Sequence, residues 1–178
     1  SILDECLKTD PESHVACEVM LSHDKVFISG EITTKASVDY VGIAKNVIEK
    51  VGYKTQDLTF ESHIHNQSQD IAQAVNKADD EVGAGDQGIM FGYATNETES
   101  YMPLCVELAH KLTNRLEQCR VAKVIHGLLP DGKSQVSAEY VDGKFNRITS
   151  IIVSAQHEET KSEQELQREI RQNVVNFV

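Results

Sequence analysis

Residues 83–98 read GAGDQGIMFGYATNET, and the first six of them fit the GxGxxG fingerprint of dinucleotide-binding folds. That fingerprint works only where a strand leads into the glycines and a helix leaves them, because the pyrophosphate then rests on the helix N-terminus. Here the polar stretch 70–77 precedes the glycines, and the apolar, strand-like stretch 89–95 follows them. The order disfavours a Rossmann fold and leaves a glycine bend between strands as the simple structural alternative.

A bend alone does not account for Asp86 and Gln87, which lie inside the glycine loop. Neighbouring residues without side chains leave this carboxylate and this amide open to a ligand. We therefore interpret the loop as part of a binding site.

Composition limits the classes of partner. The 178 residues are enough for one good core or two small ones, and 28 acidic against 17 basic residues give a formal net charge of −11. This charge argues against general binding of nucleic acid or anionic membranes, although a phosphorylated substrate needs only a local cationic pocket. No apolar run approaches the roughly 20 residues of a membrane span. Four widely spaced cysteines predict reduced thiols, no zinc site and a cytoplasmic protein.

The chain twice follows the order helix, hairpin, helix. In the first half we expect a helix at 1–7 that Asp10-Pro11 stops, strands at 15–21 and 25–32, and a helix at 38–51 before Gly52. In the second half we expect a helix at 102–119, strands at 135–140 and 145–153 around an Asp-Gly turn, and a helix at 162–177. The pattern predicts an α+β fold with mostly antiparallel sheets and helices on one face.

The run GAGDQG, the apolar stretch and the ending ATxET resemble, in order and without a gap, the characteristic motif of the methionine adenosyltransferases, or S-adenosylmethionine synthetases. The similarity extends over nearly the whole chain, through the stretches 15–18, 29–34, 67–68, 131–136 and 154–157. It implies three similar subdomains interleaved along the chain. Residues 1–70 would be part of the central subdomain, 71–96 the glycine-loop segment of the C-terminal one, and 97–178 most of the N-terminal one.

The resemblance also implies an activity. Members of this family make S-adenosylmethionine from ATP and L-methionine by attack of the sulfur on C5′ of ATP, and the triphosphate is then cleaved to pyrophosphate and phosphate. They use Mg²⁺ (two ions are expected) and K⁺, and they form homodimers with shared active sites, often paired as tetramers. The chain lacks the family's N-terminal His-Pro-Asp-Lys motif and its C-terminal part, so we expect a fragment that is inactive alone. A non-catalytic nucleotide-binding or subunit-pairing module is the alternative, and a nicotinamide-dependent oxidoreductase is a more distant one.

Lys133 is the best candidate for a catalytic residue, because an ammonium beside a glycine in the expected turn 130–134 can reach a phosphate. A solvated turn lysine is the alternative. By resemblance Asp131, Gly132 and Lys133 bind ATP, with Asp131 at the adenosine and Lys133 at the phosphates.

Four further side chains are assigned by resemblance. Glu31 would pair with the methionine ammonium, Gln67 would hold its carboxylate, Asp86 would contact bound methionine or adenosine, and Glu18 would bind K⁺. Their alternatives are an edge-strand charge for Glu31, a loop amide for Gln67 and a buried salt bridge for an inward-facing Glu18. His63, His65 and His157 receive no metal or catalytic role.

A flexible loop is expected to begin at Gln67. The stretch is polar at first and then apolar enough to form a short helix once docked, which suits a gate over the site. Its residues are Gln67, Ser68, Gln69, Asp70, Ile71, Ala72, Gln73, Ala74, Val75, Asn76 and Lys77.

Overall fold

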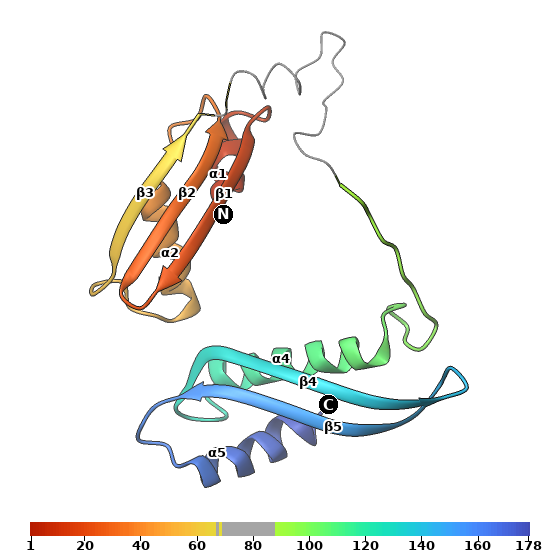
Figure 1. The fold of residues 1–178 in the computed structure, drawn as a ribbon. Helices are drawn as coiled ribbons and strands as arrows, with labels where there is room; N and C mark the ends of the chain where they lie inside the picture. The colour runs from red at the N-terminus through yellow and green to blue at the C-terminus, as the bar shows by residue number, and fades with distance from the viewer. Residues whose placement is uncertain (67, 69–87) are drawn as a thin grey trace. The chain divides into compact units, whose positions relative to one another are not determined.

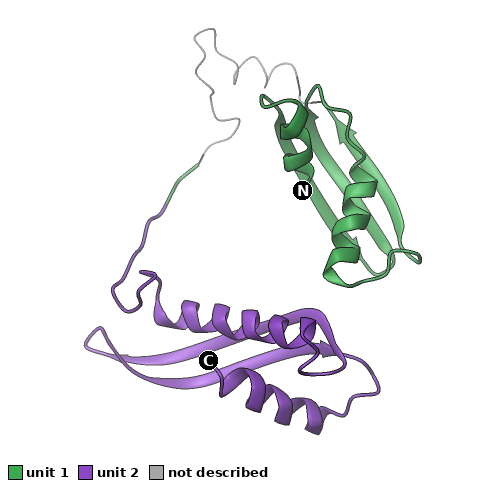
Figure 2. Ribbon diagram, turned by 180° about the vertical axis from the view of Figure 1, so that it is seen from behind, with its two compact units in different colours: residues 1–90 green, residues 91–178 purple. Residues whose placement is uncertain are grey.

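The computed structural model describes residues 1–66, 68 and 88–178, which belong to two compact units, residues 1–90 and 91–178 (Figure 2). Each unit is one continuous stretch of chain that combines a small sheet with helices (Figure 1). The α+β class is therefore confirmed. Within the described residues no helix is both long enough and apolar enough to cross a membrane.

The sheet of unit 1 has the order β1-β2-β3. Strands β1 (His14–Ser22) and β2 (Lys25–Thr33) form the predicted antiparallel hairpin, whose turn places His23 at a φ of 54°. Strand β3 (Thr59–His65) pairs with β2 in parallel, and α2 (Tyr40–Val51) makes the crossover between them. The parallel pair departs from the otherwise antiparallel arrangement and was not predicted.

Local capping explains the bounds of α2. The Asp39 side chain accepts a hydrogen bond of 2.8 Å from the backbone N–H of Gly42, and Gly52 ends the helix at a φ of 114°. Helix α1 (Ile2–Thr9) and α2 cover the same face of the sheet (Figures 1 and 2). The buried core of this unit comprises Val26, Ile28 and Ala44, packed by Ile2, Cys17, Tyr40, Val41, Ile48, Leu58, Phe60 and Ile64.

Unit 2 is a long hairpin with helices on one face. Helix α4 (Leu104–Val121) precedes β4 (Leu128–Val141) and β5 (Lys144–His157), which pair antiparallel. Asp142 and Gly143 form the turn at φ values of 50° and 75°, as the Asp-Gly signal predicts. Helix α5 (Glu163–Ile170) and the π-helical turn η1 (Arg171–Val175) follow, and both strands are longer than predicted.

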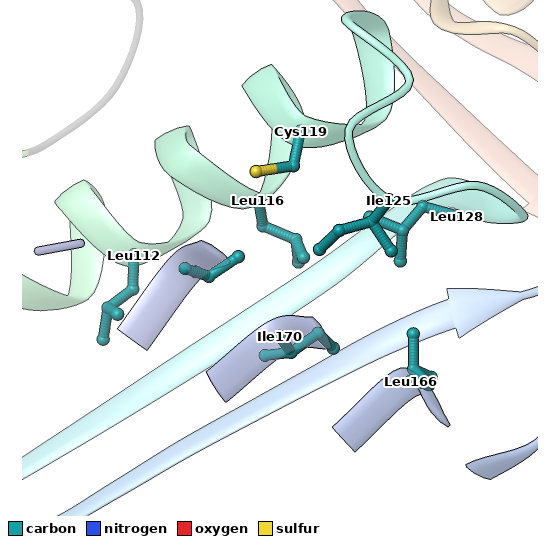
Figure 3. Packing of buried hydrophobic residues seen from close by; sticks show 8 residues of the cluster. Leu112, Leu116, Cys119, Ile125, Leu128, Leu166 and Ile170 are labelled. Atoms are coloured by element: carbon teal, nitrogen blue, oxygen red, sulfur yellow. The ribbon is translucent and has the colours of Figure 1, made fainter. Parts of the chain in front are cut away.

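The core of unit 2 lies between the helices and one face of the hairpin (Figure 3). Its buried members are Leu112, Leu116, Cys119, Ile125, Leu128, Leu166, Ile170 and Val174. Because Val136, Val153 and Ala155 complete this cluster from the strands, the other face of the hairpin carries the remaining side chains.

The predicted strand after the glycine loop does not form. Residues 88–95 belong to no strand, and Ile89, Phe91 and Tyr93 are exposed. Apolar, aromatic composition favours a strand only where a partner strand completes its hydrogen bonds, and the described residues provide none here.

Candidate functional site

Asp131, Gly132 and Lys133 lie within β4, not in the predicted turn. The backbone is extended there because β5 is long enough to pair with it, with Gly132 opposite Ala155 and Lys133 opposite Ser154. Toward the N-terminus of β4 the register shifts, and the next pair is Leu128 opposite His157. A bulge therefore lies at residues 129–131. Asp131 is exposed at the end of the bulge.

The two faces of β4 differ around Lys133. Ser134 donates a hydrogen bond of 2.7 Å to the backbone carbonyl of Ala109 in α4, and Val136 packs on the core, so these residues face the helices. Lys133 therefore points to the opposite, open face, where it is exposed. With the residues that the structure describes, its ammonium forms no ion pair. An exposed ammonium is thus left available to an anionic ligand.

Glu18 and Glu31 share the sheet face of unit 1 that the helices leave open. Cys17 and Ile28 pack against the helices, and Glu18 and Glu31 alternate with them in β1 and β2. Glu31 lies between Ala16 and His65 across the sheet, and it lines a pocket of about 210 Å³. Both carboxylates are exposed on this face.

A glycine next to Glu31 allows strands β1 and β2 to approach closely. Gly30 has a φ of 148°, and a Cβ at this position would lie 2.1 Å from the carbonyl oxygen of Ala16. Any side chain would push β2 away from β1. Gly30 thus sets the close strand approach that places Glu31 beside Ala16.

The expectation that Glu18 faces inward is wrong. Glu18 lies opposite Ser29 on the open face and is exposed, so it needs neither a cation nor a buried partner to offset burial. Among the residues that the structure describes, no three His, Cys, Asp or Glu side chains group as a metal site. One carboxylate beside one hydroxyl does not complete the oxygen cage that K⁺ or Mg²⁺ requires.

Several expected binding residues lie outside the described part of the chain. These are Gln67, Asp86 and the expected flexible loop 67–77, of which Ser68 alone is described and is exposed. Their roles stay predictions. The four cysteines are free, with Cys6 and Cys119 buried.

The motif residue Glu97 has a structural role that the sequence analysis missed. Its carboxylate accepts hydrogen bonds of 3.1 Å from the backbone N–H of Leu104 and 2.8 Å from the Tyr140 hydroxyl. It therefore caps the start of α4 and joins it to the hairpin. These bonds lower the pKa of Glu97, and the carboxylate raises the pKa of Tyr140 to about 12. A glutamate seven residues before the first helical residue lies outside the usual capping box, which explains the miss.

Glu107, in the first turn of α4, binds the same segment. Lys111 contacts its carboxylate at 2.6 Å, and the Ser100 hydroxyl donates to it. Hydrogen bonds lower the pKa of Glu107 to about 2. The bond from Lys111 has the largest effect, followed by those from Ser100 and Thr98. The ionised carboxylate thus holds residues 98–100 against the helix.

This shifted pKa predicts an acid-sensitive contact. A carboxyl with a folded pKa near 2 and an ordinary value of 4.5 contributes stability above pH 4.5 and loses it as the pH falls toward 2. Glu107→Gln should therefore lower the melting temperature at pH 6 and match wild type near pH 2, as thermal melts across this range would record. Glu99→Gln, in the same exposed segment, is the control. A deficit that does not change with pH would contradict the assignment.

The fold and the two exposed faces define an α+β protein whose first unit presents carboxylates and whose second presents a lysine beside a bulge. Comparison with known proteins gives the family. The model described as S-adenosylmethionine synthetase, N-terminal domain, matches residues 1–78, and the model described as S-adenosylmethionine synthetase, central domain, matches residues 81–178. The chain belongs to the S-adenosylmethionine synthetase family.

Individual relatives carry the same name. S-adenosylmethionine synthase of Brachyspira hyodysenteriae is 45% identical over 100% of this chain and 49% of its own length. The enzymes so named in Solidesulfovibrio magneticus and Mycoplasmopsis pulmonis are 43% and 48% identical over 98% and 89% of this chain, and over 47% and 42% of their own lengths. The chain therefore spans about half the length of the curated relatives it matches.

The family models name the segments differently from the sequence interpretation. Residues 1–78 match the N-terminal domain and residues 81–178 the central domain, where the central and N-terminal subdomains had been expected in the opposite order. The separate role expected for residues 71–96 stays a prediction, because residues 71–87 lie outside the described part.

Proposed function

We propose that the longer protein containing this chain makes S-adenosylmethionine from ATP and L-methionine. The sulfur attacks C5′ of ATP, and the expelled triphosphate is then cleaved to pyrophosphate and phosphate. The observation that carries the proposal is the exposed Lys133 ammonium on the open face of β4, in a chain that belongs to this family. The 178-residue chain alone is proposed to be inactive.

The chemistry needs electrostatics more than proton transfer. A neutral thioether requires no general base, so the site must hold sulfur, carbon and leaving oxygen in line and stabilise the departing charge. Lys133 would stabilise the triphosphate as a point charge, with Asp131 and Gly132 beside it at the nucleotide. Its exposure supports this role, because an anion can approach it without breaking an existing ion pair.

Methionine would be bound by the open sheet face of unit 1. Glu31 would pair with its ammonium at the pocket beside Ala16, and Gln67 and Asp86 would complete the contacts. Glu18 would contribute an oxygen to K⁺, and Mg²⁺, two ions in our proposal, would accompany ATP. Because the described residues do not complete a metal site, we assign no step of the reaction to a metal ion.

We further propose a homodimer with two shared active sites, paired as a tetramer. Each site would take Asp131 and Lys133 from one subunit and Glu31, Gln67 and Asp86 from the partner. Neither nucleic acid nor a membrane is proposed as a partner of this acidic chain, and its free cysteines support a cytoplasmic location.

Shared sites predict complementation between two inactive variants of the longer protein. A mixed dimer of Lys133→Ala and Glu31→Gln subunits has one site with both changes and one site with neither. Random mixing should therefore restore about a quarter of the wild-type activity, since half of the dimers are mixed and half of their sites are intact.

The complementation is measured as S-adenosylmethionine formed after the two variants are co-expressed. Each variant expressed alone is the control. Failure to recover activity in mixed dimers that mass spectrometry verifies would place both residues in one subunit's site. Full activity of both single variants would instead show that neither Lys133 nor Glu31 serves the reaction.

A further inference from the structure

Ser134 joins the strand that carries Lys133 to helix α4. Its hydroxyl donates a hydrogen bond of 2.7 Å to the backbone carbonyl of Ala109, 25 residues away in the sequence, and the contact is partly buried. A hydroxyl at a helix–strand contact is costly unless it is bonded in this way. The bond therefore selects one position of β4 along the helix.

Gly132 makes the second contact between β4 and α4. A Cβ at this residue would lie 2.7 Å from Cδ2 of Leu116, which is 6% exposed and belongs to the core of unit 2. The Leu116 side chain thus occupies the space that a Cβ at residue 132 would need. Gly132 and Ser134, two residues apart, bind the same face of β4 to α4 on either side of Lys133.

The neighbouring bulge makes these two contacts important. Between the pairs Leu128 with His157 and Gly132 with Ala155, three residues of β4 oppose one residue of β5. The hydrogen-bond ladder between β4 and β5 is interrupted at the bulge. Pairing on the N-terminal side of Gly132 therefore does not fix the register of β4. The position of Lys133 along α4 is then set by the contacts of Gly132 and Ser134 with the helix and by the pairing of β4 with β5.

We infer that Ser134 is a positioning residue for Lys133. Ser134 holds Lys133 at the position along α4 where the ammonium meets the departing triphosphate. The inference rests on the proposed function. Ser134 itself faces α4, and it acts through the direction and position of the preceding residue, Lys133.

The expected effect separates kcat from KM. In the longer protein, Ser134→Ala should lower kcat by about tenfold, because a displaced charge stabilises the transition state less well. The KM for methionine should stay within about twofold of wild type, since methionine is assigned to unit 1. Thr113→Ala is the matched control, because the Thr113 hydroxyl contacts the same carbonyl of Ala109 at 3.3 Å from within α4.

A double-mutant cycle tests whether Ser134 acts through Lys133. We expect Ser134→Ala to lower kcat in the wild type, and to have no further effect once Lys133 is alanine, because the group it positions is gone. An equal loss in both backgrounds, or no loss in the wild type, would overturn the positioning role. A Lys133→Ala variant with full activity would instead overturn the proposed role of Lys133.

Stability is measured in parallel for all variants. If Ser134→Ala lowers the melting temperature more than Thr113→Ala does, the same cycle is run with Ser134→Cys, which keeps the size of the side chain and weakens the donor. Loss of kcat that depends on Lys133 in this second cycle supports the inference. Loss that is independent of Lys133 contradicts it.

Discussion

Lys133→Ala, made in the longer protein that contains this chain, is expected to lower kcat by about 10²–10³-fold, the usual effect of removing one group that stabilises transition-state charge. In the proposed reaction negative charge on the triphosphate grows as the bond to C5′ breaks, so the ammonium would interact more strongly with the transition state than with bound ATP. The KM for methionine should change little. Steady-state rates at varied ATP and methionine separate these parameters.

Lys144→Ala is the matched control for this prediction. Lys144 is exposed at the other end of the same hairpin, opposite Val141 and beside the turn. Its removal should leave kcat within about twofold of wild type, as is usual for exposed residues away from special contacts. If Lys133→Ala behaves like Lys144→Ala, Lys133 is a solvated surface lysine and not a ligand of the triphosphate.

Leu112→Ala should destabilise unit 2 by about 2–5 kcal/mol, because the change removes buried methyl groups and leaves a cavity that the core closes only in part. Leu112 is 1% exposed and belongs to the cluster that joins α4, α5 and the hairpin (Figure 3). Hydrogen exchange of the amides in α4 and β4 measures this loss directly.

Val121→Ala provides the comparison on the same helix. Val121 is 67% exposed, so its truncation should change the free energy of unfolding by less than about 0.5 kcal/mol. Equal protection factors in the two variants would show that Leu112 does not belong to a packed core.

Local signals in the sequence predicted most of the elements. Asp142-Gly143 and the alternation around it predicted the β4–β5 hairpin, and Gly52 marked the end of α2, because a turn or a cap depends on a few adjacent residues. The parallel pairing of β3 with β2 was missed, because helix α2 separates the two strands in the sequence. The strand expected at 89–95 does not form, for a related reason: strand formation depends on a partner strand that composition does not reveal.

In the candidate site, too, the features that depend on packing could not be predicted from the local sequence. Alternation along β1 and β2 could have placed Glu18 and Glu31 on one face, but which face the helices leave open depends on packing. Lys133 was expected in a turn because Pro130 and Gly132 are typical turn residues, whereas here they accompany a bulge and a close helix contact. The capping role of Glu97 depends on the fold of residues 95–104 and had no local signal.

The most direct test of the central claim is to identify the products formed when the longer protein is incubated with ATP, L-methionine and Mg²⁺. Mass spectrometry should find S-adenosylmethionine, with one pyrophosphate and one phosphate for each ATP consumed. Recovery of intact ATP from a protein that binds it would contradict the claim, because binding without transfer is the behaviour of a nucleotide-binding module and not of a methionine adenosyltransferase.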